Sequence, residues 1–244
     1  MPQVPRTSHL TAPARLELPA HVRVVDSFED LLAVPFEGPC NAICWKRALT
    51  GDFEEVVRRL PAGEGIATID EADLEALPVH AAGAAAVATL LADLRGLREA
   101  GHAPELECIE RYVRDHDDVL PTDVHSFHVD SATVPTDTFL CCYSGAAPEG
   151  LSSAEAERCV DVPHLRAALL ARHGGLDDER FASYLHERHF DLHYRPLAQA
   201  RPFSMGIGHL WRLAVRFPGS PVSACIHRAP ATRPGDPRRL LLIS

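Results

Sequence analysis

The spacing of apolar and polar residues changes along the chain, from mainly helical patterns in the first half to more strand-like patterns in the second. Apolar residues three or four positions apart are typical of one buried helix face, whereas strict alternation is typical of a half-buried strand. Helical spacing predicts six helices, at residues 27–32, 52–60, 82–100, 105–114, 162–173 and 177–188. Alternation predicts strands at 21–25, 40–47, 205–215, 222–226 and 239–243, and two more within 124–143, broken near Pro135.

Helices that come first and short strands that come later indicate the α+β class. We expect a β-sandwich or barrel-like core with the N-terminal helices packed on one side and a helical insertion, or lid, at about 150–200. Residues 1–20 hold four prolines and few large apolar groups, so they are predicted to form a flexible N-terminal arm. Residues 21–244 are then expected to form a single domain.

Composition excludes some partners. The formal net charge of −10 argues against a nucleic-acid-binding protein, which needs a basic face for the phosphates. The most apolar stretch, 81–94, is mainly alanine and is too short to span a membrane. No cationic N-terminus with an apolar segment is visible, which predicts a cytoplasmic protein with seven reduced, mostly buried cysteines. Cys141 and Cys142 are adjacent, so on a strand they would point to opposite faces.

Candidate metal ligands lie in the strand-like region. Chance alone predicts about one His-x-Asp triplet in a chain of this composition, and three occur. Only His128-Val-Asp130 lies within a strand-like run, where residues i and i+2 project to the same face. His227 follows the predicted strand 222–226 and would add a second histidine. Two histidines and one carboxylate form a facial triad that leaves three metal positions open, as in non-haem iron enzymes.

Two arginines follow, Arg238 and Arg239, at the start of the last predicted strand. A guanidinium that points inward can bind a carboxylate with two hydrogen bonds. The distal end of 2-oxoglutarate is such a carboxylate. Because adjacent residues on a strand face opposite ways, only one of the two arginines can serve.

These motifs together resemble the bacterial family DUF1826. The similar stretches are Phe127-His128-Val-Asp130, Tyr143-Ser-Gly145, His227-Arg-Ala-Pro230, Arg239-Leu-Leu-Leu242 and Asn41-Ala-Ile-Cys-Trp-Lys-Arg47. Ala229 departs from the usual serine, and the interval between Asp130 and His227 is long. The order His-x-Asp, distant His, then Arg is also similar to the Fe(II)/2-oxoglutarate oxygenase superfamily, which implies a double-stranded β-helix (jelly-roll, cupin-like) core.

The resemblance implies roles for individual residues. His128, Asp130 and His227 would hold Fe(II), and Arg239, or failing that Arg238, would pair with 2-oxoglutarate. Tyr143 would donate a hydrogen bond into the site. O2 would be the oxidant and a small molecule the substrate, with an amino acid, another metabolite and a peptide side chain all left open. Because Asp130 stands where related halogenases have a small residue, hydroxylation or another oxidation is expected.

A second hypothesis is a non-catalytic zinc protein of metal homeostasis, a role suspected for some members of the similar family. His186, His189 and His193 would share one helix face if the helix continued that far, and such a stripe can bind zinc. The competing interpretation is an ordinary polar helix face. The segment 145–205 is expected either to cover the site or to form a homodimer contact.

Overall fold

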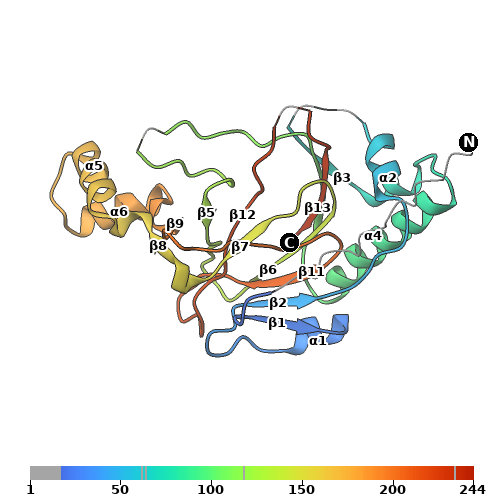
Figure 1. Cartoon of the computed structure of the whole chain (residues 1–244), viewed down its shortest axis with the longest axis horizontal. Coiled ribbons are helices and arrows are strands. Elements are labelled where there is room, and N and C mark those ends of the chain that lie inside the picture. Colours follow the sequence, from blue (N-terminus) through green and yellow to red (C-terminus); the bar gives the residue numbers. More distant parts are fainter. Residues whose placement is uncertain (1–17, 62, 64, 118, 234) are drawn as a thin grey trace, which may run out of the picture.

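The computed structural model describes residues 18–61, 63, 65–117, 119–233 and 235–244. Two β-sheets form its centre, and helices lie at both ends of the molecule (Figure 1). The fold is therefore mixed α+β, as predicted. Most of the predicted N-terminal arm, residues 1–17, lies outside the described residues. No helix in the described part is long and apolar enough to cross a membrane.

The larger sheet has seven strands in the order β1-β2-β11-β6-β13-β4-β3. Its strands are β1 (Val22–Val25), β2 (Ala42–Trp45), β3 (Ile66–Ile69), β4 (Glu105–Ile109), β6 (Asp137–Ser144), β11 (Leu210–Ala214) and β13 (Arg239–Ile243). All its pairings are antiparallel except β1 with β2. Cys141 contributes to a core on one face and Cys142 to a core on the other, as the alternation predicts.

Helices from the first half cover one face of this sheet. They are α1 (Phe28–Ala33), α2 (Phe53–Arg59), α3 (Glu71–Glu75) and α4 (Ala81–Glu99). Leu90, Leu94 and Leu97 of α4 are almost fully buried against that face. The predicted helices at 27–32, 52–60 and 82–100 are confirmed. Ser27 and Asp52 cap the first two through their side chains, as short polar residues commonly do at helix starts.

The smaller sheet has six strands in the order β10-β7-β12-β5-β9-β8. Its strands are β5 (Phe127–His128), β7 (Glu149–Leu151), β8 (Ala156–Arg158), β9 (His193–Pro196), β10 (Phe203–Ser204) and β12 (Ile226–Arg228). Phe203 and Met205 pack into the core on the face of the larger sheet that the helices leave free. The sheets therefore share a core on that side.

The predicted helix at 105–114 is wrong. Residues 105–109 form β4, which pairs with β3 on one side and with β13 on the other. Ile109, Tyr112 and Val113 imitate helical spacing, but Leu106 and Cys108 are buried between more exposed glutamates, which is the strand period. Pairing with β3 and β13 makes this segment a strand and not a helix. The predicted strand at 222–226 is also displaced, because β12 begins at Ile226.

The predicted helices at 162–173 and 177–188 are confirmed as α5 (Pro163–His173) and α6 (Glu179–Glu187). Gly174 ends α5 in the left-handed conformation, with φ of 73°. With the short helices η1 (Ser153–Glu155), η2 (Cys159–Asp161) and η3 (Phe190–Leu192), they belong to the segment between β7 and β10. Phe181 and Leu169 anchor a separate small core there, at the opposite end from α2 and α4 (Figure 1).

A buried ion pair ties α4 to the larger sheet. Asp93 accepts hydrogen bonds from the Arg47 guanidinium and, at 2.6 Å, from the Tyr143 hydroxyl. Burial by itself lowers the pKa of Arg47, but the hydrogen bond and charge of Asp93 raise it by more, so the net pKa is raised. Removing one partner of a buried pair leaves the other charge uncompensated.

Asp93→Ala is therefore expected to lower the free energy of unfolding by about 3–5 kcal/mol. Glu75→Ala is the control, because it removes an exposed ion pair with Arg95, for which about 0–1 kcal/mol is expected. Urea denaturation followed by circular dichroism measures both. Equal losses in the two variants would contradict a stabilising role for the buried pair.

Candidate metal centre

Strand register brings the candidate ligands together. β12 pairs with β5 so that His227 lies directly opposite His128. Residues opposite each other on antiparallel strands project to the same face, and so does Asp130, two positions beyond His128. The backbone of Asp130 is fixed by a hydrogen bond from the Arg216 amide, at 2.9 Å. His227 thus meets His128 and Asp130, although at least 97 positions separate it from them in the chain, because β5 and β12 pair in this register.

Three side-chain donors form one cluster. One ligand atom from each of His128, Asp130 and His227 lies within 4.8 Å of the others. The Nε2 atoms of His128 and His227 are 3.9 Å and 3.7 Å from the two carboxylate oxygens of Asp130. Two atoms bound to one ion at about 2.1 Å can be at most about 4.2 Å apart. Each histidine meets this limit against one of the two carboxylate oxygens, whereas the set of three single atoms is bounded at 4.8 Å, so metal binding would draw the donors slightly closer together. The donor set suits Fe(II), and also zinc and other divalent metals.

The far side of each imidazole is held by the backbone. His128 Nδ1 lies 2.8 Å from the carbonyl oxygen of Ser126, and His227 Nδ1 lies 3.2 Å from that of Cys225. A carbonyl only accepts, so each Nδ1 must carry the proton, which leaves each Nε2 lone pair free toward Asp130. Metal-binding histidines are usually oriented by such an outer hydrogen bond. Both imidazoles are therefore preset in the tautomer that binds a metal.

Electrostatics favour the same protonation states. Burial, and next the neighbouring His227, lower the pKa of His128 to about 4, so His128 is neutral at physiological pH. Burial by itself raises the pKa of Asp130, but His227 and the Thr138 hydroxyl, which donates to Asp130 at 2.6 Å, lower it by more. The net pKa of Asp130 is lowered and the carboxylate is charged. A neutral imidazole beside a carboxylate is the ligand state that a divalent metal requires.

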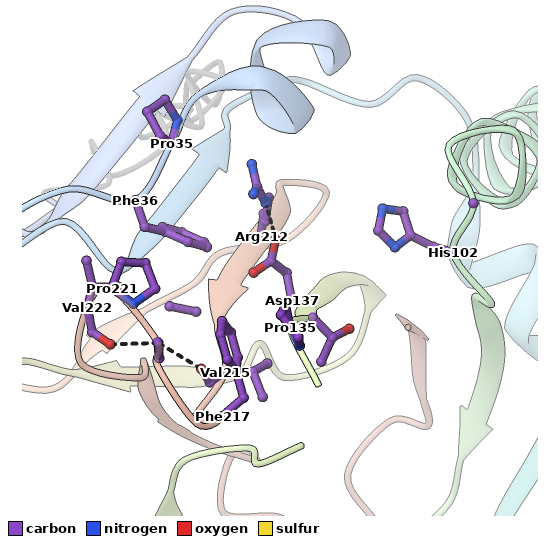
Figure 2. A pocket seen from close by; sticks show the side chains of 14 residues that line it. Pro35, Phe36, His102, Pro135, Asp137, Arg212, Val215, Phe217, Pro221 and Val222 are labelled. Carbon is purple, nitrogen blue, oxygen red and sulfur yellow. Dashed lines mark hydrogen bonds and ion pairs between the residues drawn. The ribbon is translucent and has the colours of Figure 1, made fainter. Parts of the chain in front are cut away.

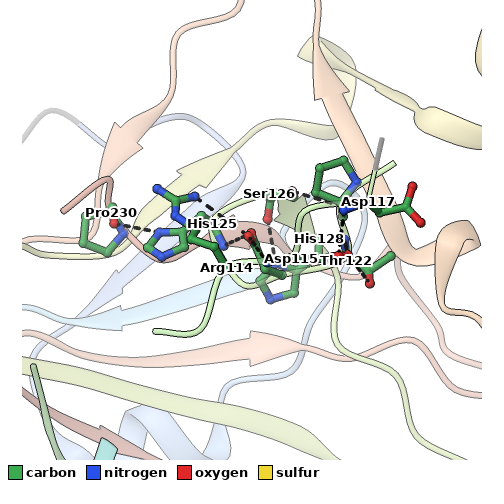
Figure 3. Close-up of polar contacts among 10 residues, drawn as sticks. Arg114, Asp115, Asp117, Thr122, His125, Ser126, His128 and Pro230 are labelled. Atoms are coloured by element: carbon green, nitrogen blue, oxygen red, sulfur yellow. Dashed lines mark hydrogen bonds and ion pairs between the residues drawn. The ribbon is translucent and has the colours of Figure 1, made fainter. Parts of the chain in front are cut away.

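An aspartate-rich loop holds the carbonyl that orients His128. The Asp115 carboxylate accepts hydrogen bonds from the backbone N–H and hydroxyl of Thr122, and Asp123 accepts one from the backbone N–H of His125 (Figure 3). The Ser126 hydroxyl donates to the carbonyl of Pro121. These bonds fold residues 115–117 and 119–126 back on themselves immediately before β5. The loop therefore fixes the direction from which the Ser126 carbonyl meets His128.

A cavity of about 130 Å³ opens beside the triad, between the two sheets. The smaller sheet contributes His128 and His227, and the larger sheet contributes apolar side chains and Arg239. The full lining is Tyr112, Val124, His128, Asp130, Leu140, Pro148, His227, Arg228, Ala229, Arg239, Leu241 and Ile243. Metal donors, apolar walls and one guanidinium thus face a single small space.

Arg239 is buried, with 2% of its surface exposed. Its Nε donates to the carbonyl of Ala146 at 2.8 Å and its Nη1 to the hydroxyl of Tyr112 at 3.2 Å, while its buried Nη2 has no hydrogen-bond partner in the described part of the chain. No carboxylate in the described part of the chain lies within ion-pair distance of Arg239. Gly145 permits this position, because a Cβ at Gly145 would lie 2.8 Å from the Arg239 Cγ. A buried, half-satisfied guanidinium is a receptor for an anion.

The other two predicted cosubstrate residues lie elsewhere. Arg238 points the opposite way and donates to the backbone carbonyl of Val57 in α2 and, at 2.8 Å, to that of Pro61 just beyond α2. Tyr143 is buried against Asp93 in the helix-facing core and does not line the cavity. The phenol beside Arg239 is Tyr112, which the sequence did not reveal, because its segment was predicted to be helical. Arg238 and Arg239 are adjacent in the sequence but thus make different contacts: Arg238 bonds to the α2 region and Arg239 faces the cavity.

The histidine stripe does not form. Helix α6 ends at Glu187, His189 adopts a left-handed conformation with φ of 60°, and His193 begins β9. His193 instead lies opposite His128 in the smaller sheet, with the two rings 5.8 Å apart. The proposed zinc face of a continued helix is therefore wrong. Helices α5 and α6 also contribute no described residue to the cavity, and Pro148 is the one described residue of 145–205 that lines it.

A larger cavity, of about 570 Å³, lies elsewhere, near the start of β6 (Figure 2). Phe36, His102 and Phe217 line it together with Asp137 and Arg212. Its charged groups satisfy each other, since Arg212 Nε is 2.6 Å from the Asp137 carboxylate and its Nη1 donates to backbone carbonyls of the α1 region. It contains no member of the triad, so the smaller cavity is the candidate site.

No family model, curated protein or solved structure matches the chain. The geometry of the site is therefore the basis for assigning a function.

The triad is expected to bind one divalent metal per chain. His128→Ala should abolish stoichiometric Co(II) binding, measured by absorption spectroscopy and metal analysis, because it removes one of three protein donors. His186→Ala is the control, since its exposed imidazole lies outside the triad. Co(II) retained by His128→Ala and lost by His186→Ala would contradict the assignment.

Thr138→Val should weaken metal binding by about 10–100-fold, because it removes the hydroxyl that orients the Asp130 carboxylate. Thr89→Val is the matched control, since the Thr89 hydroxyl donates to a backbone carbonyl on the exposed surface of α4. A competition titration with a chromophoric chelator measures both affinities. Equal affinities in the two variants would show that the Thr138 hydrogen bond does not tune the metal.

Proposed function

We propose that the protein is a non-haem Fe(II)/2-oxoglutarate-dependent oxygenase that hydroxylates or otherwise oxidises a small polar metabolite or amino acid. One observation carries the proposal: the unpartnered Nη2 of Arg239 and the open triad of His128, Asp130 and His227 face the same cavity. A metal site alone fits many functions. A metal site with a buried carboxylate receptor in the same small space fits a keto acid that has a second carboxylate.

The arrangement of the sheets supports a jelly-roll core. The two histidines belong to adjacent antiparallel strands of the smaller sheet, Asp130 lies just beyond β5, and the arginine belongs to the larger sheet. A cosubstrate between the sheets would reach both. The resemblance to the oxygenase superfamily and to DUF1826 rests on the order of the sequence motifs: His-x-Asp, then a distant His, then Arg. That resemblance stays a prediction.

The residues of the cavity have distinct tasks. Arg239 would hold the distal carboxylate of 2-oxoglutarate through Nη2, and the hydroxyl of Tyr112, already bonded to Arg239, would share that carboxylate. Leu140, Leu241 and Ile243 line the same space and would exclude water from it, which strengthens the ion pair. Burial raises the pKa of Tyr112, so its phenol stays protonated and able to donate.

The triad would hold Fe(II) through two neutral imidazoles and one carboxylate. Bound Fe(II) supplies O2 activation: one oxygen atom enters the succinate formed as 2-oxoglutarate loses CO2, and the other enters a C–H bond of the substrate to give an alcohol. The resemblance implies that halogenases would have a small residue where Asp130 stands, so a carboxylate at this position favours hydroxylation over halogenation. The hydrogen bonds that the two imidazoles donate to the carbonyls of Ser126 and Cys225 would keep the donors aligned.

The direct test is Fe(II)-dependent conversion of 2-oxoglutarate to succinate by the purified protein. Asp130→Ala should abolish it, because the metal loses its only anionic protein donor. Arg239→Gln should raise the KM for 2-oxoglutarate at least tenfold, since it removes the charge-assisted hydrogen bond that Nη2 would donate to the distal carboxylate. Arg238→Gln is the neighbouring control and should leave KM within twofold, because Arg238 contacts α2 instead.

Full turnover without iron, or an unchanged KM in Arg239→Gln, would refute the oxygenase proposal. Stoichiometric zinc bound by the triad, with no 2-oxoglutarate turnover in the iron-loaded protein, would favour the non-catalytic zinc protein instead.

A further inference from the structure

A second cavity, of about 370 Å³, lies next to the candidate metal centre. It is formed by the loop between β4 and β5 and the loop between β12 and β13. The residues that line it are Glu110, Arg111, Tyr112, Arg114, His125, Thr232, Arg233, Gly235 and Asp236. Its volume falls in the range of small-molecule sites, about 300–1,000 Å³.

The two cavities share a wall. Tyr112 lines both of them, and His125 in the second cavity directly follows Val124 in the first. The His125 ring packs edge-on against Tyr112, with the ring centres 5.6 Å apart. A molecule seated in the second cavity would therefore contact the same phenol that contacts Arg239.

A buried histidine joins the two loops. His125 is 8% exposed, and its Nδ1 lies 3.1 Å from the carbonyl oxygen of Pro230, with Arg114 close by (Figure 3). This bond links the segment before the first metal ligand to the segment after His227. The loops that form the second cavity are thus fixed to the strands that carry the metal ligands.

The lining of the second cavity contains three arginines, all exposed, and two acidic residues, in a protein of net charge −10. Arg114 lies 3.9 Å from the Asp123 carboxylate, and the Asp236 carboxylate accepts the backbone N–H of Arg233. Arg111 and the guanidinium of Arg233 have no carboxylate within ion-pair distance among the described residues. Glu110 also lines the cavity, but it pairs with neither. Two arginines therefore remain free to bind an anion.

We infer that this second cavity binds the anionic group, a carboxylate or a phosphate, of the primary substrate. The inference rests on the proposed oxygenase function for the meaning of "substrate", while the anion site itself rests on the cavity. Arg111 and Arg233 hold the anion, and Tyr112 separates it from the cosubstrate. The carbon to be oxidised then extends from the second cavity toward the metal. The substrate anion and the 2-oxoglutarate carboxylate are thus held by different arginines.

The test compares anion binding with cosubstrate binding in the full-length protein. Binding of inorganic phosphate is followed by ³¹P NMR and binding of acetate by ¹³C NMR. The variants are Arg111→Gln/Arg233→Gln, Arg239→Gln, and Arg180→Gln/Arg201→Gln as a control with the same charge change. The control arginines are exposed, as Arg111 and Arg233 are, but they line neither cavity.

Arg111→Gln/Arg233→Gln should weaken the tighter-binding anion at least tenfold and leave the KM for 2-oxoglutarate within twofold. Arg239→Gln should leave anion affinity unchanged and raise the KM for 2-oxoglutarate. The control pair should change neither anion affinity nor this KM. Tighter phosphate binding indicates a phosphate ester, and equal or tighter acetate binding indicates a carboxylic acid.

The inference is overturned if neither anion binds saturably, if the control pair weakens binding as much as Arg111→Gln/Arg233→Gln, or if anion binding is lost in Arg239→Gln alone. The proposed function fails separately. Without any 2-oxoglutarate turnover in the wild type, the same pattern of phosphate binding would leave the anion site standing and remove only its assignment to an oxygenase substrate.

Discussion

The pairing of β5 with β12 is the constraint on which the rest of the site depends. Each strand is short, and their shared register puts His227 opposite His128. A slip of one residue would turn a histidine to the other face of the sheet and dismantle the triad. The structure secures this register on both sides, since β9 pairs with β5 and β7 pairs with β12. The aspartate-rich loop and the bond from His125 to Pro230 brace the ends of the same pair.

A second constraint is the placement of buried positive charge. Arg47 and Arg239 are both largely buried, but Arg47 has Asp93 as its partner and Arg239 has no carboxylate in the described part of the chain. The first arrangement is a complete structural network, and the second is incomplete until an anion arrives. Because a buried guanidinium without a counter-charge is costly, the position of Arg239 beside the candidate metal donors supports the proposed anionic ligand. The structure thus separates an arginine that stabilises the fold from one suited to function.

Local patterns in the sequence were sufficient for five of the six predicted helices and for the grouping of His128, Asp130 and His227, but they missed α3 and wrongly made 105–114 helical. The strand period placed His128 and Asp130 on one face, and the alternation at Arg238 and Arg239 showed that only one could point inward. Which one does so depends on the neighbours of β13, which lie far away in sequence. Tyr112 escaped detection for the same reason, because its segment becomes a strand and loop through pairing with β3 and β13.

The most direct test of the central claim is a crystal structure of the protein grown with Fe(II) and 2-oxoglutarate in the absence of O2, with iron located by anomalous scattering. The expected result is iron on the Nε2 atoms of His128 and His227 and the carboxylate of Asp130, with the distal carboxylate of 2-oxoglutarate on Nη2 of Arg239. Iron bound elsewhere, or 2-oxoglutarate that leaves Arg239 without a partner, would contradict the account.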